Sequence, residues 1–512
     1  MIIKSLNSCS LIWLTLLFTV VLKFTISLNT GLFEDEAIYW SWSQTPDPSY
    51  SFTTLLSLKL LSSLFGNESE LFVRLPALIS NFVLLFFFFR IGKLLGADEL
   101  KILYTSLLFF SVPFVTIYTS FISPDSMLLL FSVASIYFAM KIIKLNKTAD
   151  WILCGLSLGL MLLSKYTGII YFLIFVFYLL INRNIFSEGF AKKLLLLILT
   201  YLITVSPLLY WNLFNEPVWL NHYLFTDADM ISSGYFDLLK VFFFSQIAIM
   251  LPFIFILIVL IIKNIFSVKN KSGQEKFLLF LFSAMLIVFI IIALSGKIKG
   301  NWFFIMYIPL LISVMVMTIS KYFKILLAMS VTVNILILVI LNLPVSGINS
   351  ITDNFLGKYI SGTFQNYWPG HTGNAHNDNS WKERLVKMKN WKNTISVISE
   401  EIGRTKAEYD FFATNDFNLV SLLEYYFHTG EKIYLLGDLR FKYINSAEPN
   451  LKLAGKNAIL ISYDERDFNN FESKFEKVIL LKKIDRDPSK DFTKDFILSY
   501  GENFNPSDPM QK

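Results

Sequence analysis

Histidine and cysteine are both scarce in this chain of 512 residues, with four and two copies. Cys9 and Cys154 lie inside separate apolar stretches, so they do not build a disulfide framework. His371 and His376 lie far from the apolar part, which argues against a histidine metal centre there. Charged residues make up only 16%, and the basic ones are scattered over short loops without forming a stripe. The net charge of +6 therefore does not indicate a nucleic-acid partner.

Apolar side chains, by contrast, are abundant. The chain is 54% hydrophobic, carries 51 phenylalanines and has a mean hydropathy of +0.55, more than a soluble protein of this size needs. The first apolar stretch is longer than a signal-peptide core and no small-x-small cleavage site follows it, so we expect an uncleaved first span. Windows of roughly twenty apolar residues predict about eleven membrane spans, near residues 9–28, 72–90, 102–121, 126–143, 150–164, 166–182, 194–213, 238–262, 277–295, 301–319 and 323–343.

The distribution of charge predicts the orientation of these spans. Lysine and arginine gather in alternate loops, and the loops between them hold most of the acids. Because cytoplasmic loops are enriched in Lys and Arg, we place the N-terminus in the cytoplasm. An odd number of spans then puts the C-terminal segment outside, in a protein of the inner (plasma) membrane.

From about residue 346 the long apolar runs stop and charge becomes dense. Residues 346–395 are predicted to be irregular. Beyond them, apolar runs at 409–414, 432–436, 458–463 and 478–481 predict strands, with helices at 417–429 and 467–475. Strands that alternate with helices indicate an α/β domain with a partly parallel sheet. We therefore predict a polytopic α-helical membrane domain at 1–345 and a soluble extracytoplasmic α/β domain at 346–512.

The first outer loop, residues 29–71, opens with Glu34, Asp35 and Glu36 directly after the first span. Acids in this position either remain solvated, begin a helix whose dipole favours them, or face a cavity that also collects cations. Apolar residues at mixed helical spacing in 51–65 predict a helix that lies flat on the membrane.

Other outer turns carry charges with two interpretations each. Asp125 follows a Ser-Pro turn, where it either caps the next helix or takes part in a functional site on the outer side. Lys165 lies between two apolar runs, where its ammonium either snorkels to the membrane surface or takes part in the same functional site. Lys297 and Lys299 occupy an outer turn against the orientation rule, and glycines flank them. Flexible cations beside accessible backbone amides suit a phosphate group.

Five different short motifs follow one another along the predicted outer side of the membrane domain. They are Asp35-Glu36-Ala37-Ile38-Tyr39-Trp40, Glu70 with Arg74-Leu75-Pro76, Ser123-Pro124-Asp125, Lys165-Tyr166, and Lys299-Gly300-Asn301-Trp302. In these motifs the chain resembles a GT-C-fold glycosyltransferase of the dolichyl-phosphate-mannose-protein mannosyltransferase-like superfamily, which includes bacterial lipid A aminoarabinose transferases and lipopolysaccharide-core sugar transferases. Bacterial members often carry His or Lys followed by two prolines in the first outer loop, where this chain has Tyr50, Ser51 and Phe52.

The resemblance implies a sugar donor linked to polyprenyl phosphate, an acceptor hydroxyl on a cell-envelope glycolipid, lipopolysaccharide or protein, and contact with membrane lipid. Asp35 matches the family's catalytic acid and Glu36 its neighbour, and we expect Asp35 to act as general base. Direct attack by the acceptor would invert the anomeric centre.

The remaining candidates divide into two groups. Those expected to bind the donor phosphate are Lys165, Lys297, Lys299 and Arg74. Those expected to support the site are Asp125, Tyr166, Asn301, Trp302 and Glu70. Glu36 and Asp125 leave a divalent cation open, since two carboxylates do not establish a metal. No other cofactor is indicated.

Two other classes stay as alternatives. A lipid or solute transporter would place ionisable residues near the membrane midplane and often has duplicated halves. A surface-polysaccharide polymerase or ligase would use the same lipid-linked substrate and differ in its acceptor.

Overall fold

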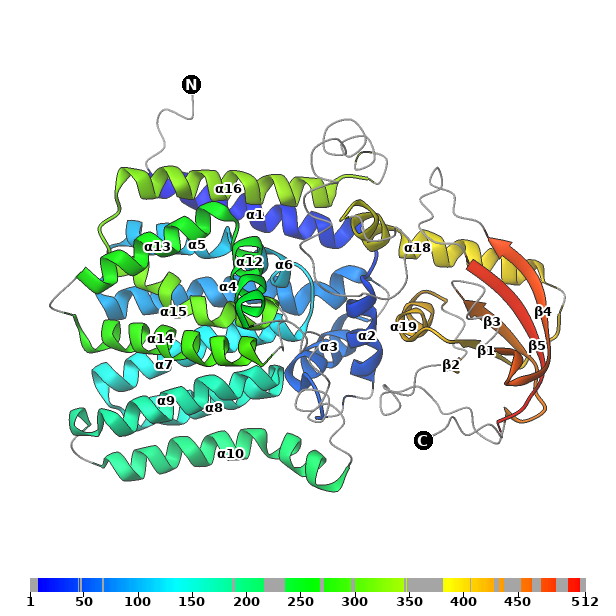
Figure 1. The fold of residues 1–512 in the computed structure, drawn as a ribbon, viewed down its shortest axis with the longest axis horizontal. Coiled ribbons are helices and arrows are strands. Elements are labelled where there is room, and N and C mark those ends of the chain that lie inside the picture. The colour runs from blue at the N-terminus through cyan, green and yellow to red at the C-terminus, as the bar shows by residue number, and fades with distance from the viewer. Residues whose placement is uncertain are drawn as a thin grey trace. The chain divides into compact units, whose positions relative to one another are not determined.

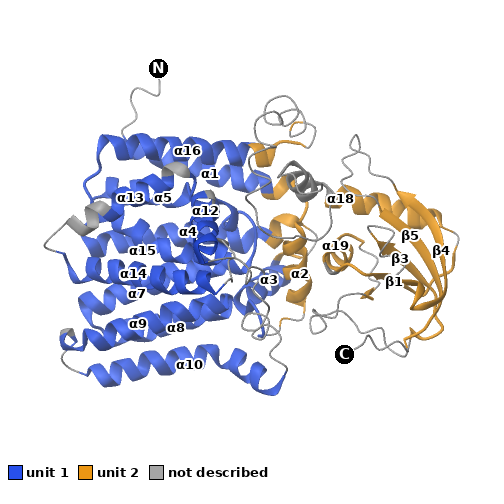
Figure 2. Cartoon of the chain, viewed as in Figure 1, with its two compact units in different colours: residues 1–26, 47–64, 74–339 blue, residues 27–46, 65–73, 340–512 orange. Residues whose placement is uncertain are grey.

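The computed structural model describes residues 8–44, 46, 48–66, 69–186, 189–215, 235–267, 271–295, 300–344, 347, 381–405, 407–427, 432–436, 453–462, 471–484 and 496–506. The chain divides into two compact units (Figure 2). The first unit comprises residues 1–26, 47–64 and 74–339, and the second comprises residues 27–46, 65–73 and 340–512. The second unit therefore takes two pieces of the first outer loop in addition to the C-terminal part.

The first unit is helical (Figure 1). Its elements, some of which extend a few residues into the second unit, are α1 (Ser8–Asn29), α3 (Phe52–Phe65), α4 (Glu70–Leu95), α5 (Glu99–Phe110), α6 (Pro113–Tyr118), α7 (Pro124–Leu145), α8 (Thr148–Ser164), η2 (Tyr166–Gly168), α9 (Ile169–Ile181), η3 (Arg183–Ile185), α10 (Phe190–Phe214), α12 (Tyr235–Met250), α13 (Pro252–Ser267), α14 (Gly273–Leu294), η4 (Gly300–Met306), α15 (Tyr307–Ile312), η5 (Ser313–Val316) and α16 (Lys321–Asn342).

Within the described residues, six helices are long and apolar enough to cross a membrane: α1, α4, α7, α10, α14 and α16. Shorter apolar helices lie at 52–65, 148–164, 166–181 and 301–316. Two of the expected spans are each divided into two helices. Proline has no backbone N–H and restricts the residue before it, so Pro113 begins α6 and Pro252 begins α13. The count of about eleven spans stays a prediction.

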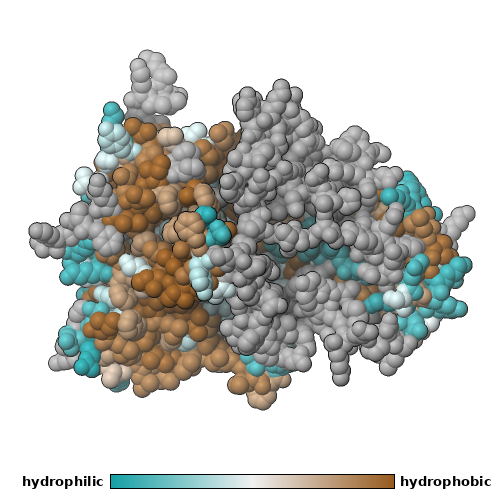
Figure 3. Space-filling model, viewed as in Figure 1, coloured by the Kyte–Doolittle hydropathy of each residue, from teal (hydrophilic) through white to brown (hydrophobic). Residues whose placement is uncertain are grey.

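Much of the surface of the first unit is apolar. Figure 3 shows a predominantly hydrophobic face over the described residues of this unit. On α10, for example, Ile203 is 71% exposed and Leu213 79% exposed. An apolar surface of this extent would be unfavourable in water, and it suits contact with lipid chains.

The second unit contains the helix α2 (Glu34–Gln44) and an α/β part with α18 (Trp381–Arg404) and α19 (Phe417–Tyr426). Its five strands are β1 (Phe411–Thr414), β2 (Ile433–Leu435), β3 (Ala458–Ser462), β4 (Phe475–Ile484) and β5 (Phe496–Phe504), in the order β2-β1-β3-β5-β4. β1 pairs in parallel with β2 and β3, and β5 pairs antiparallel with β3 and β4.

The four strand ranges expected from the sequence overlap β1 to β4, and the first expected helix overlaps α19. Three details differ. The sequence did not predict β5, and α18 is regular helix where residues 381–395 were expected to be irregular. Within the second expected helix, residues 471 and 472 are helical, residue 475 begins β4, and 467–470 lie outside the described residues.

Candidate active site

The helix α2 begins with the three acids that open the first outer loop, Glu34, Asp35 and Glu36. Carboxylates in the first turn interact favourably with the positive end of the helix dipole. Glu36, which is 1% exposed, accepts a hydrogen bond at Oε2 from the backbone N–H of Phe33, 3.1 Å away. This is half of a capping box, in which a glutamate in the first turn satisfies the residue before the helix. Glu36 therefore holds the start of the helix that carries Asp35.

Asp35 combines an accessible side chain with crowded surroundings. The protein around it raises the pKa of its carboxyl above the ordinary value, and the charge of Glu36 raises that pKa further. Its surface nevertheless remains open to solvent, and water screens an exposed charge. Solvent screening therefore moderates the upward shift in the pKa of Asp35 and does not reverse it. A carboxylate with a raised pKa is a stronger base, which suits proton abstraction near neutral pH.

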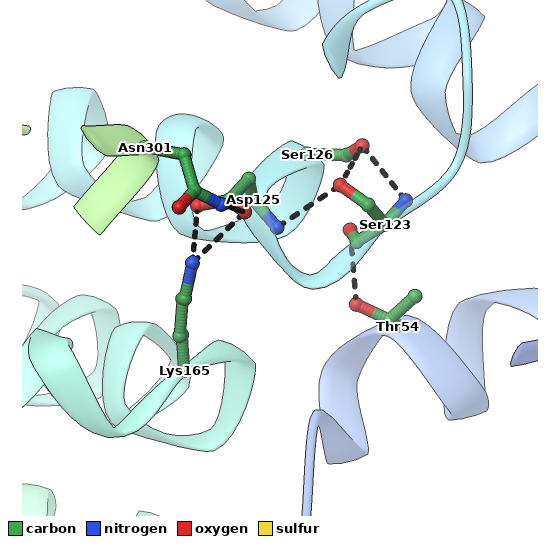
Figure 4. Close-up of polar contacts among 6 residues, drawn as sticks. All are labelled: Thr54, Ser123, Asp125, Ser126, Lys165 and Asn301. Carbon is green, nitrogen blue, oxygen red and sulfur yellow. Dashed lines mark hydrogen bonds and ion pairs between the residues drawn. The ribbon is translucent and has the colours of Figure 1, made fainter. Parts of the chain in front are cut away.

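A second group of polar side chains forms in the first unit (Figure 4). Lys165 Nζ donates to both carboxylate oxygens of Asp125 at 2.9 Å, and Asn301 Nδ2 lies 3.5 Å from Asp125 Oδ2. The two charged side chains are almost fully buried, at 4% and 6% exposed. Asp125 lies in the first turn of α7, Lys165 follows α8 and Asn301 lies in η4, so three distant segments meet at one buried pair.

The start of α7 explains how Asp125 is free to pair with Lys165. Ser123 is the N-cap residue, and its Oγ accepts the backbone N–H of Asp125 at 3.2 Å. Ser126 Oγ in turn accepts the backbone N–H of Ser123 at 3.1 Å. Ser123 therefore caps the helix, while the Asp125 carboxylate binds a cation. Lys165 does not snorkel, because its ammonium is buried against that carboxylate.

Further hydrogen bonds fix the segments around this pair. Tyr166 Oη donates to the backbone carbonyl of Ser49 at 2.7 Å, and the Thr53 and Ser164 hydroxyls lie 2.6 Å apart. Thr54 Oγ1 donates to the carbonyl of Ser123 at 3.4 Å. The N-terminal end of α3 is thus tied both to the end of α8 and to the start of α7.

The remaining predicted residues are dispersed. Glu70 Oε1 accepts hydrogen bonds from Lys392 Nζ at 3.2 Å and Tyr426 Oη at 3.3 Å, all within the second unit. Arg74 is fully buried in the first unit, with its guanidinium 5.1 Å from the centroid of the Phe121 ring.

Trp302 packs against the apolar core of the first unit. Lys297 and Lys299 lie outside the described residues. In the first unit the structure brings together Asp125, Lys165 and Asn301. In the second it places Asp35 and Glu36 on α2.

Among the buried polar groups that the sequence analysis missed is one centred on Lys23 in α1. Its Nζ donates to Asn81 Oδ1 at 2.8 Å and to Thr119 Oγ1 at 2.6 Å, and it lies 5.4 Å from the centroid of the Phe110 ring. A charged residue inside the first apolar stretch was the available signal, because such residues are costly and almost always have partners inside the protein.

Among the described residues, no three side chains of His, Cys, Asp or Glu are grouped so that they could hold a metal ion. Both oxygens of Asp125 accept hydrogen bonds from the Lys165 ammonium. A divalent cation held by Glu36 and Asp125 stays a prediction.

The described residues thus form a largely helical first unit with six helices long and apolar enough to cross a membrane, and known proteins share features of its sequence and fold. A family profile described as dolichyl-phosphate-mannose-protein mannosyltransferase matches residues 51–211. The crystal structure of ArnT from Cupriavidus metallidurans bound to undecaprenyl phosphate matches with a TM-score of 0.62 at 13% identity, over 96% of this chain and 98% of that one. The apo structure of the same protein matches with a TM-score of 0.61 at 14% identity, over 95% and 97%.

Among curated proteins, the lipid A galacturonosyltransferase RgtD of Rhizobium johnstonii is 23% identical over 298 residues, which are 55% of this chain. The match spans 61% of the length of that relative. Together the matches confirm the resemblance, first drawn from short motifs, to the GT-C mannosyltransferase-like glycosyltransferases.

Proposed function

We propose that this protein is an integral membrane glycosyltransferase that moves a sugar from a polyprenyl-phosphate donor to a hydroxyl of a cell-envelope acceptor. Asp35 carries the proposal, because it is an accessible carboxylate of raised pKa on the first helix after the first span. Likeness to a lipid A galacturonosyltransferase, and to an ArnT structure solved with undecaprenyl phosphate, supports this class of donor and a lipid A-like acceptor.

In the proposed reaction, Asp35 takes the proton from the acceptor hydroxyl as its oxygen attacks the anomeric carbon. The bond from that carbon to the phosphate oxygen breaks, and the polyprenyl phosphate leaves with the electron pair. General-base catalysis of this kind contributes roughly 10²–10⁴-fold. One direct displacement inverts the anomeric centre, and it needs no second carboxylate as nucleophile.

The leaving phosphate gains negative charge and requires donors or cations. A lysine ammonium has three N–H groups, and within the described residues Lys165 directs two of them at Asp125. The third can meet a phosphate oxygen while Asp125 holds the ammonium in place. Lys297, Lys299 and Arg74 complete the proposed phosphate-binding set, with Asn301, Tyr166, Trp302 and Glu70 in support.

This reaction takes place on the extracytoplasmic side of the inner membrane in our proposal, with the C-terminal domain on the same side. The orientation rests on the clustering of Lys and Arg in alternate loops. The proposed domain division, 1–345 and 346–512, follows from the same change in composition near residue 346.

The test uses the full chain in proteoliposomes with three synthetic donors: undecaprenyl phosphate linked to galacturonic acid, mannose or aminoarabinose. Lipid A and its core-bearing form serve as acceptors. We expect release of undecaprenyl phosphate and a glycosylated acceptor of inverted anomeric configuration with at least one donor, measured by mass spectrometry and NMR. Movement of an intact donor across the bilayer without bond cleavage would instead establish a transporter. Successive addition of repeating units would establish a polymerase.

A further inference from the structure

The helix that carries Asp35 packs inside the second unit, together with elements from the far end of the chain. α2 belongs to the same compact unit as the α/β part, and it lies against α19. A helix of 11 residues is marginal when isolated in water, so most of its stability must come from packing. Ile38, Ser41 and Trp42 are among its buried residues and follow one another at helical spacing. What α2 packs on therefore decides where Asp35 lies.

The first set of contacts joins the middle of α2 to α19. Ser41 Oγ donates to Glu424 Oε2 at 2.5 Å. Burial raises the pKa of Glu424, and the hydrogen bond from Ser41 partly opposes that shift. Beside this bond, the Trp40 and Tyr425 rings meet edge to face, with centroids 4.9 Å apart. Ser41 is about one and two-thirds helical turns from Asp35, so this contact fixes the rotation of the helix about its axis.

The second set holds the chain just before α2. Tyr426 Oη accepts the backbone N–H of Leu32 at 2.7 Å and donates to Glu70 Oε1 at 3.3 Å. Lys392 on α18 donates to the same Glu70 oxygen at 3.2 Å. One phenol thus connects the entry to α2 with the start of α4. A β-carbon at Gly31 would lie 3.0 Å from the Tyr426 oxygen, so the fit leaves little room for a side chain there.

We propose that the C-terminal α/β part positions the helix that carries the base, with Glu424 and Tyr426 as its positioning residues. The inference rests on the proposed function, because it assigns a purpose to the position of Asp35. Displacing a reacting group by about 1 Å can cost about 10²-fold in rate. Loss of either anchor should therefore lower kcat while leaving binding of the lipid-linked donor, and so its KM, nearly unchanged.

The first test measures how firmly α2 is held, by a method that does not depend on catalytic activity. Hydrogen–deuterium exchange of the full chain in lipid nanodiscs is compared for wild type, Glu424→Ala, Tyr426→Phe and Gly31→Ala. We expect faster exchange at residues 34–44 in all three variants, with β3 and β5 protected as in wild type. Tyr500→Phe is the matched control, because its phenol donates to the carbonyl of Glu408 within the same unit. Unchanged protection of α2 in Glu424→Ala and Tyr426→Phe would overturn the inference.

The second test measures kinetics with whichever of the three undecaprenyl-phosphate donors the wild type uses. We expect kcat to fall about 10–100-fold in Glu424→Ala and Tyr426→Phe, with donor KM within about threefold. Glu424→Gln keeps an acceptor for Ser41 and should recover most of the rate, whereas a merely structural loss would not be rescued this way. A rise in KM at constant kcat in both variants, or no rescue by Glu424→Gln, would contradict positioning.

The two failures are distinguishable. A wild-type protein that cleaves none of the donors refutes the proposed function, and the exchange experiment still decides whether the α/β part holds α2. A variant that also loses protection in β3 and β5 has lost its fold. Glu424→Gln then decides between the two interpretations. Protection restored in β3, β5 and α2 would support Glu424 as an anchor of α2. Protection restored in β3 and β5 but not in α2 would contradict it.

Discussion

Asp35 and Asp125 are both acids that follow an apolar segment, yet the protein surrounds them in opposite ways. Asp125 is buried and bonded through both oxygens to the Lys165 ammonium. Asp35 is accessible, and the protein around it raises the pKa of its carboxyl, with the negative charge of Glu36 adding to that shift. The two carboxylates belong to different compact units. Environments that differ this much assign different roles to the same chemical group.

The difference separates a carboxylate that can change its protonation state from one that holds a cation in place. A proton acceptor needs access to the acceptor hydroxyl and a pKa shifted toward neutrality, and Asp35 has both. A carboxylate that orients a lysine needs burial and good geometry, because an imperfect buried pair does not recover its desolvation cost. Asp125 meets that requirement. Variants at the two positions should therefore fail in different ways.

The largest effect is expected at Asp35. Asp35→Asn keeps the size of the side chain and removes the base, so transfer should fall about 10²–10⁴-fold, with normal membrane insertion and thermal stability. Turnover of the undecaprenyl-phosphate donor in proteoliposomes measures it. Glu34→Gln is the matched control, because it removes a charge from the same helical turn and should retain activity within a few-fold. Wild-type turnover in Asp35→Asn would exclude this residue as the base.

The next effect concerns stability. Lys165→Met leaves the buried Asp125 carboxylate without its cation, which should lower the free energy of unfolding by about 3–5 kcal/mol. Adding Asp125→Leu removes the stranded charge and should recover much of that loss, as followed by thermal unfolding in detergent.

Activity then separates the two roles of Lys165. If its third N–H binds the donor phosphate, the double variant should regain stability and remain poorly active. Lys141→Met is the control, since Lys141 forms an ion pair with Asp150, which is 2% exposed, elsewhere in the first unit. It should reduce stability without changing donor kinetics in protein that stays folded. Full activity in the stabilised double variant would exclude Lys165 from phosphate binding.

The sequence predicted the elements that local rules determine. Apolar windows located the helices, because a hydrophobic run of sufficient length has few other stable states in a membrane. The acids of 34–36 indicated a helix start among other interpretations, and α2 begins there. The sheet was predictable for β1 and β3, whose residues are all buried, and the expected ranges also overlap β2 and β4. By contrast, β5 mixes Gly501 and Glu502 into its pattern and was not predicted.

Partnerships between distant residues were not predictable from one sequence. Nothing local indicates that Asp125 pairs with Lys165, that Ser123 caps in its place, or that Tyr426 accepts the N–H of Leu32. These bonds depend on how the helices pack against one another, and the spacing of apolar residues along the sequence does not predict that packing. Lys23 is the exception, because a charge within an apolar span almost always has a partner inside the protein, so its position alone is sufficient to predict one.

A smaller effect is expected on the pH dependence. The base must be deprotonated, so kcat/KM should fall as pH drops through the pKa of Asp35, which lies above the ordinary value of about 3.9. Glu36→Gln removes the charge that helps to raise this pKa, so the acidic limb should move to lower pH. The amide oxygen of the variant can still accept the N–H of Phe33. Glu36→Asp keeps the charge and should leave the limb near its wild-type position. A limb that stays in place in Glu36→Gln would mean that Asp35 is not the titrating group.

The smallest effect is expected at the cap that orients Asp125. Ser123→Ala removes the hydroxyl that accepts the Asp125 N–H and should cost about 1 kcal/mol of stability, while Ser123→Asp, which keeps a capping oxygen, should cost less. Thermal unfolding in detergent measures both. Ser63→Ala, in which the lost hydroxyl only bonds the carbonyl of Leu60 on an exposed surface, should change stability by about 0.5 kcal/mol or less. If Ser123→Ala were as damaging as Lys165→Met, the cap rather than the ion pair would hold this part of the first unit together, and the contrast between Asp125 and Asp35 would lose its electrostatic basis.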